Sequence, residues 1–107
     1  MVRLVTWSLL ACSIGLGAVD PPRSKSHTIV IEDMRFQPEV LTVAAGDTVV
    51  WINNDLVPHT ATSKAGKFDS KTIPAGGSWT YAIRSTGDIA YRCTFHPTMT
   101  AVLQVTR

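Results

Sequence analysis

From residue 27 onward, short runs of apolar and β-branched residues alternate with turn-forming residues, and none of these runs has the period of an amphipathic helix. Seven runs have the length and composition of strands: 27–32, 40–44, 47–53, 58–63, 78–84, 88–93 and 101–106. Turn residues separate several of them, as in Pro74-Ala75-Gly76-Gly77. This spacing predicts an all-β fold, an antiparallel Greek-key β-sandwich of seven to eight strands.

Alternation within the runs predicts which side chains face the interior. In the run 88–93 the inward positions are Ile89, Tyr91 and Cys93, so Cys93 ends a strand with its thiol directed into the sandwich. The same rule gives inward faces to two further runs: Trp79, Tyr81 and Ile83, and Ala101, Leu103 and Val105.

The first residues follow a different pattern. Arg3 gives the start of the chain a positive charge, residues 4–18 are uncharged and mostly apolar, and Asp20-Pro21-Pro22 ends the run. The alternative of a buried N-terminal helix is disfavoured because the run has no polar face. The pattern predicts three segments: an export signal over 1–18, a linker over 19–26 and one domain over 27–107.

The signal leaves two processing routes open. Small residues at Gly17 and Ala18 suit cleavage by an ordinary signal peptidase, whereas Leu9-Leu10-Ala11-Cys12 resembles a lipobox in which Cys12 becomes a lipidated N-terminus. Either route predicts a periplasmic or otherwise extracytoplasmic protein. Only the second route would attach it to a membrane.

Cys93 is the only thiol that the predicted domain keeps, since Cys12 is either removed or acylated. A single cysteine excludes a disulfide framework. An unpaired thiol in an oxidising compartment is expected to be occupied by a bound group, although a buried, inert cysteine is the common alternative.

Charge excludes one class of partner. Without Arg3 the ten Lys and Arg residues become nine, against eight Asp and Glu, which leaves no basic footprint for nucleic acid. The local excess at Lys64, Lys67 and Lys71 is typical of a solvated loop.

The segment that joins the last two predicted strands carries three soft or borderline metal ligands. Cys93, His96 and Met99 follow one another at intervals of three residues, and His59 supplies a second imidazole from an earlier strand region. Two histidines and a cysteine with a weak axial methionine are the ligands of an electron-transfer copper. Cys-x-x-His also occurs in zinc sites, but zinc seldom takes a thioether.

Residues 28–106 resemble the cupredoxins, and within them the amicyanins and the plastocyanin-like copper proteins of bacteria. The resemblance rests on three stretches: 39–53, Pro58-His59, and the loop Cys93-Thr94-Phe95-His96-Pro97-Thr98-Met99, whose short Cys-to-Met spacing is amicyanin-like. It implies that His59, Cys93, His96 and Met99 hold one type 1 copper ion that cycles between Cu(I) and Cu(II). Such a protein carries single electrons; a periplasmic copper storage or delivery protein with the same ligands is the rival interpretation.

Three positions depart from the family's usual residues: Phe95 stands in place of proline, Thr60 in place of asparagine, and Ala101 in place of glycine. The usual asparagine ties the two ligand loops together, and the Thr60 hydroxyl could serve instead. Phe95, unlike proline, has a backbone N–H. In one alternative that N–H donates a hydrogen bond to the Cys93 sulfur. In the other it is bonded to water, and the Phe95 side chain is simply part of the apolar surface.

The resemblance also implies a route for the electron. His59 should be buried, and the ring edge of His96 should reach the surface within an apolar collar formed by Phe95, Pro97, Val57 and Pro58. Redox protein partners of unknown identity would dock there through a small, transient interface. The protein is expected to be a monomer. No acid–base pair or activated nucleophile is evident, so no enzyme is predicted.

Overall fold

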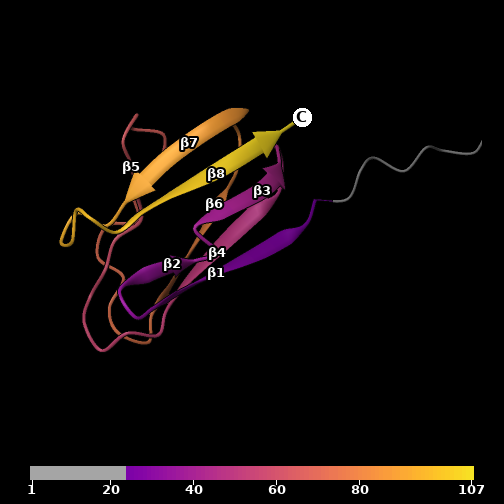
Figure 1. Ribbon diagram of the computed structural model, residues 1–107. Helices are drawn as coiled ribbons and strands as arrows, with labels where there is room; N and C mark the ends of the chain where they lie inside the picture. The colour runs from indigo at the N-terminus through magenta and orange to yellow at the C-terminus, as the bar shows by residue number, and fades with distance from the viewer. Residues whose placement is uncertain (1–23) are drawn as a thin grey trace, which may run out of the picture.

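A computed structural model describes residues 24–107; the predicted export signal and Cys12 lie outside the described residues. Eight strands form two facing four-stranded sheets (Figure 1). One sheet has the order β2-β1-β4-β6 and the other the order β3-β8-β7-β5. The strands are β1 Ser26–Glu32, β2 Arg35–Gln37, β3 Val40–Ala44, β4 Thr48–Asn53, β5 Thr62–Ser63, β6 Ser78–Ala82, β7 Gly87–Arg92 and β8 Thr100–Thr106. Within residues 24–107 no helix is long and apolar enough to span a bilayer.

The predicted all-β sandwich of seven to eight strands is confirmed, with one difference in pairing. Four strand pairs are antiparallel, but β1 pairs with β4 and β3 pairs with β8 in parallel. Between the two strands of each parallel pair, the chain crosses to the other sheet and forms at least one strand there. It then crosses back, so the second strand of the pair runs in the same direction as the first. Sequence alternation cannot detect this because it reports burial and not strand direction.

The interior follows the predicted alternation. Ile89, Tyr91 and Cys93 are buried, as are Ala101, Leu103 and Val105 on the neighbouring β8. Trp51 of β4 is fully buried between the sheets. Burial of a large apolar side chain contributes about 1.5–3 kcal/mol to the stability of the fold. This interior therefore stabilises the strands from which the loops at both ends of the sandwich extend.

Two strands differ from the sequence prediction. The three-residue β2 was not predicted, because its single apolar residue, Phe36, offers no alternation to detect. The predicted strand 58–63 is reduced to Thr62–Ser63, and His59 instead forms an isolated bridge with Ile73. In Figure 1 the β1–β2 turn, the β4–β5 segment and the β7–β8 loop lie together at the end of the sandwich away from the C-terminus.

At the opposite end, Asp47 fixes the beginning of β1 to the β3–β4 turn. Its buried carboxylate accepts hydrogen bonds from the backbone N–H of Lys25 at 2.9 Å and of Ala44 at 3.0 Å. The ring Nε2 of His27 lies 2.9 Å from the same carboxylate. The Lys25 bond most of all, then those of His27 and Ala44, lower the pKa of Asp47 to about 2.

This arrangement predicts an acid-dependent loss of stability. A carboxylate whose pKa is depressed by folding stabilises the fold fully above its unfolded pKa of 3.8, and the contribution disappears as the pH falls towards about 2. Asp47→Asn should lower the melting temperature at pH 7 and remove part of its decline between about pH 4 and pH 2. Asp88→Asn, an exposed carboxylate of β7, is the control with the same charge change. Equal acid dependence in wild type and Asp47→Asn would contradict the assignment.

Candidate metal centre

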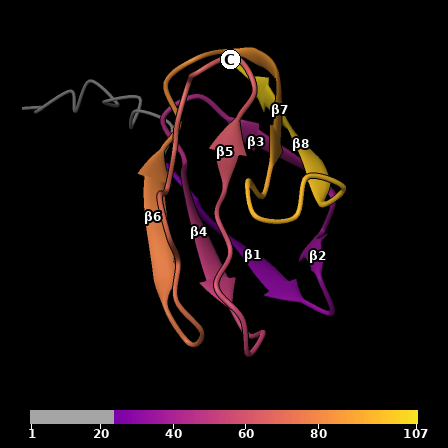
Figure 2. The ribbon, with the colours of Figure 1, turned by 90° about the vertical axis from the view of Figure 1, so that its left-hand side faces the viewer.

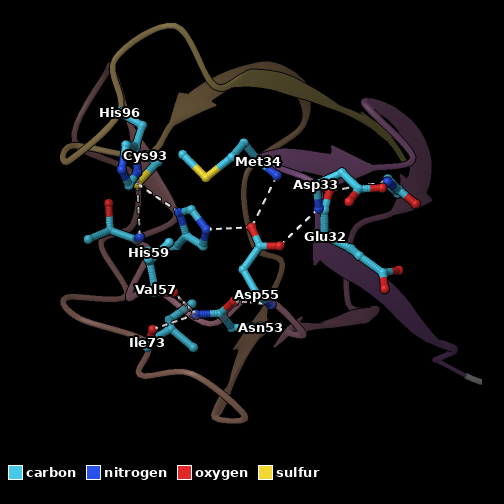
Figure 3. Close-up of polar contacts among 12 residues, drawn as sticks. Glu32, Asp33, Met34, Asn53, Asp55, Val57, His59, Ile73, Cys93 and His96 are labelled. Carbon is cyan, nitrogen blue, oxygen red and sulfur yellow. Dashed lines mark hydrogen bonds and ion pairs between the residues drawn. The ribbon is translucent and has the colours of Figure 1, made fainter.

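Three of the four predicted ligands meet at one end of the sandwich. The potential ligand atoms of His59, Cys93 and His96 all lie within 4.8 Å of one another. Cys93 Sγ is 3.6 Å from His59 Nδ1 and 3.7 Å from His96 Nδ1 (Figure 3). A sulfur and a nitrogen that bind one ion at about 2.0–2.3 Å, with an angle of about 110–120° between them, lie roughly 3.6–3.8 Å apart. The spacing therefore fits a metal ion shared by all three side chains.

The loop after β7 places Cys93 and His96. Cys93 is fully buried where β7 ends, and its backbone N–H donates to the carbonyl of Met99 at 3.1 Å. The N–H of Met99 donates in turn to the carbonyl of His96 at 2.8 Å. These two bonds close the loop into a tight unit. Met99 is buried at its end, and His96 is half-buried.

His59 is fully buried, as predicted, and is held at both its backbone and its ring. Its N–H and carbonyl exchange hydrogen bonds with Ile73 at 3.1 and 2.7 Å. Its ring Nε2 lies 2.7 Å from a carboxylate oxygen of Asp55. An ionised carboxylate can only accept, so Nε2 carries the proton and Nδ1 presents a lone pair towards Cys93. That tautomer is the one that binds a metal through Nδ1.

Asp55 is also the link between His59 and the β1–β2 turn. It accepts hydrogen bonds from the backbone N–H groups of Asp33 at 2.9 Å and Met34 at 3.1 Å. Both residues of this turn have positive φ, 53° and 57°, which aims their N–H groups at the carboxylate. Burial alone would raise the pKa of Asp55, but the hydrogen bonds from His59 and the two N–H groups outweigh it and hold the pKa below the usual value. In Figure 3 the Met34 side chain extends from this turn towards the ligand group.

Asn53 shapes the segment that carries Asp55 and His59. Its fully buried amide donates to the carbonyls of Val57 at 2.9 Å and Ile73 at 3.0 Å, and its oxygen accepts from the N–H of Asp55 at 3.0 Å. The roles of Asn53 and Asp55 were not predicted from the sequence. The available signals were an inward polar residue at the end of a strand and a carboxylate four residues before a ligand histidine.

Thr60 joins the two ligand segments. Its hydroxyl accepts the N–H of Thr94 at 2.9 Å, as its replacement of the family's asparagine predicted. Its own N–H donates to Cys93 Sγ at 3.3 Å. Among residues 24–107 the backbone donor to this sulfur is Thr60, and no hydrogen bond joins the Phe95 N–H to it; the Phe95 side chain is half exposed.

Thr60→Val tests this link, because it keeps the shape of the side chain but removes the hydroxyl. The Thr94 N–H and the hydroxyls of Thr62 and Thr94, which lie 3.0 and 3.1 Å from the Thr60 hydroxyl, then lose a buried partner. The free energy of unfolding of the metal-free protein, measured with urea, should fall by about 1–2 kcal/mol. Thr42→Val, which removes an exposed hydroxyl bonded to Gln104, should change it by less than about 0.5 kcal/mol. Equal effects would show that the link adds no stability.

The residues predicted to form an apolar collar are exposed, and His96 is half-buried. Every residue of the predicted collar, Phe95, Pro97, Val57 and Pro58, is exposed. Leu56, which sequence reasoning did not include, is 96% exposed and extends the collar along the β4–β5 segment.

Comparison with known proteins agrees with the fold. The cupredoxin-like domain family matches residues 2–105. An amicyanin of Paracoccus versutus is 28% identical over 78% of the chain and 67% of its own length. Amicyanin-alpha of Methylorubrum extorquens is 30% identical over 78% of the chain and 75% of its own length.

Solved structures show the same similarity. A reduced amicyanin in which one tryptophan is replaced by tyrosine superposes with a TM-score of 0.71, at 26% identity over 76% of this chain and 82% of that one. A purple cupredoxin of Nitrosopumilus maritimus superposes with a TM-score of 0.67, at 28% identity over 75% of this chain and 99% of that one. With a matched sandwich, a matched family pattern and amicyanins among its relatives, the chain belongs to the cupredoxin-like family.

Proposed function

We propose that the protein is a type 1 copper electron carrier with His59, Cys93, His96 and Met99 as ligands. The observation that carries the proposal is the convergence of Cys93 Sγ and two imidazole Nδ1 atoms at distances of 3.6 and 3.7 Å, which fits one shared ion. Membership of the cupredoxin-like family, with amicyanins among the relatives, supports copper as that ion. Met99, buried at the end of the same loop, is the proposed weak axial ligand.

Copper, when bound, supplies a one-electron couple between Cu(I) and Cu(II). The protein's own contribution is to hold the ligands still. Asp55 fixes the ring of His59, and the Thr60 N–H and the loop hydrogen bonds fix Cys93. Neither buried ligand can move far without breaking these bonds. A site that is already in place needs little rearrangement when an electron arrives or leaves.

The proposed route for the electron is the exposed edge of His96. The apolar collar and Leu56 would contact redox protein partners there, through a small interface that forms and separates quickly. We expect a monomer that catalyses no reaction of its own. The predicted signal over residues 1–18 supports a periplasmic or other extracytoplasmic location, with a membrane anchor only if Cys12 is lipidated.

Copper loading tests the proposal directly. The Cu(II) form should be intensely blue and should show narrow copper hyperfine splitting in electron paramagnetic resonance. Met99→Gln should keep the colour and lower the reduction potential, because an amide oxygen favours Cu(II) over Cu(I). A colourless Cu(II) protein, or one that binds zinc in preference to copper, would exclude a type 1 site.

The burial of two proposed ligands favours an electron carrier over a copper storage or delivery protein. His59 and Cys93 are both fully buried, so release of the ion needs their segments to open. We expect copper transfer to a chelator to be slow compared with repeated oxidation and reduction in a voltammetry experiment. Rapid loss of Cu(I) to a chelator would favour delivery.

A further inference from the structure

The turn between β1 and β2 carries a methionine where the backbone favours glycine. Asp33 and Met34 join the two antiparallel strands, and both have left-handed backbone angles, with φ of 53° and 57°. A two-residue hairpin turn with positive φ at both positions favours Asn or Asp at the first and glycine at the second. A long side chain is disfavoured at positive φ. The chemistry of the turn therefore does not account for methionine at its second position.

The turn holds Met34 beside the proposed metal ligands. One oxygen of Asp55, Oδ2, accepts the N–H of Met34 at 3.1 Å and lies 2.7 Å from Nε2 of His59. The backbone of Met34 is thus joined to a ligand ring through a single atom. Strand β2, which follows the turn, contacts β8, and Figure 2 shows the β1–β2 hairpin beside the β7–β8 loop. In Figure 3 the thioether of Met34 points from the turn towards His59 and Cys93.

Two methionines lie within residues 24–107, and they differ in their access to solvent. Met99, the proposed axial ligand, is 5% exposed, whereas Met34 is 40% exposed. Of the other donors, His59 and Cys93 are fully buried and His96 is half-buried. An ion that arrives from solution therefore reaches Met34 and His96 before it reaches the three buried donors.

The two accessible donors differ in the metals that they accept. A thioether is a soft ligand that suits Cu(I), whereas an imidazole also binds Zn(II) and Cu(II). The thiolate and two imidazoles of the interior would bind Zn(II) as well. A thioether at the entrance therefore favours Cu(I) when the ion is captured, without changing the ligands that hold it afterwards.

We propose that Met34 is an entry ligand through which Cu(I) reaches the buried donors; the inference rests on the proposed copper site. The bond from Cu(I) to the Met34 sulfur forms as a solvent ligand leaves. It breaks as the ion binds His96 and Cys93, whose thiol releases its proton to water. The ion stays Cu(I) throughout, so the step needs no oxidant or reductant. Met34 is not a ligand of the loaded site.

This role has a kinetic signature that distinguishes it from a structural role and from that of a permanent ligand. A ligand that binds the ion only on its path lowers the same barrier for entry and for exit. Its removal should therefore slow uptake and release of Cu(I) by the same factor and leave the equilibrium affinity unchanged. Removal of a permanent ligand would change the affinity and the Cu(II) spectrum.

Stopped-flow mixing of the metal-free protein with Cu(I) in acetonitrile can measure uptake through the ultraviolet absorption of the Cu(I)–thiolate bond. Met34→Leu keeps an apolar side chain of similar size and removes the sulfur. It should take up Cu(I) about tenfold more slowly, as expected for a barrier raised by about 1.4 kcal/mol. Release of Cu(I) to an excess of chelator should slow by the same factor. Uptake of Co(II), which serves as a coloured substitute for Zn(II), should be equal in wild type and Met34→Leu.

Two further variants separate the sulfur from the turn and from surface hydrophobicity. Met34→Gly suits the backbone of the turn and should slow Cu(I) uptake as Met34→Leu does. Val40→Ala, which shortens an exposed apolar side chain outside the collar, should leave uptake unchanged.

Each protein is first checked for the blue Cu(II) spectrum, so that absence of a type 1 site in the wild type is detected as failure of the proposed function. Three results would overturn the role of Met34 while the blue site stands. They are equal Cu(I) uptake in wild type and Met34→Leu, an equal slowing of Co(II) uptake, and a changed Cu(I) affinity in Met34→Leu.

Discussion

Cys93→Ala is expected to abolish the blue absorption of the Cu(II) protein completely. The colour of a type 1 site arises from the bond between copper and a thiolate, and Cys93 is the only cysteine in the described chain. The three remaining proposed ligands would still bind copper, but without charge compensation. Copper affinity should therefore fall by more than the roughly 10–100-fold typical for loss of a supporting residue around a metal.

The other cysteine provides the matched control. Cys12→Ala should leave the colour, the hyperfine splitting and the reduction potential unchanged, since the proposed site does not include it. Urea unfolding of metal-free Cys93→Ala distinguishes loss of a ligand from loss of the fold. A blue Cys93→Ala protein, or a colourless Cys12→Ala protein, would refute the ligand assignment.

Asp55→Ala is expected to have the second largest effect, although Asp55 is not a proposed ligand. The substitution leaves the buried Nε2 of His59 and the N–H groups of Asp33 and Met34 without their acceptor. Hydrogen bonds to a charged group contribute about 1.5–3 kcal/mol each, and water can replace part of those at the exposed turn. The metal-free protein should lose about 2–4 kcal/mol of unfolding free energy.

The same substitution should weaken copper binding about 10–100-fold, because the ring of His59 is no longer held with Nδ1 towards the site. The hyperfine splitting and the potential should change as well. Asp55→Asn, which keeps one acceptor oxygen, should lie between wild type and Asp55→Ala. Asp88→Ala, which removes an exposed carboxylate of β7, is the control and should leave spectrum and potential unchanged. Lower stability with an unaltered spectrum in Asp55→Ala would restrict Asp55 to a structural role.

Much of the architecture could be predicted because it depends on local patterns. Alternation placed Cys93 on the inner face of a strand, and the spacing of His96 and Met99 placed both on one loop with it. The burial of His59 was predicted by the resemblance, and the structure confirms it.

The missed features depend on contacts between residues far apart in the chain. Asp55 meets Asp33 across 22 positions, and the Thr60 N–H meets Cys93 Sγ across 33. Neither partner can be chosen from the local sequence, since many polar residues lie in the same segments. The parallel pairing of β1 with β4 has the same origin, because only the path through the other sheet determines it.

The separation of His59 from Cys93 also determines when a metal ion can be acquired. The two residues are 34 positions apart, and their atoms meet only when the β4–β5 segment rests against the end of β7. An extended chain therefore has no assembled site, and ion capture follows folding. An ion that binds the folded form alone adds its binding energy to the fold, about 4.1 kcal/mol at a free concentration roughly 1,000 times the dissociation constant. If the chain is exported unfolded, loading takes place at its destination, and the metal supplied there determines how long each molecule stays folded.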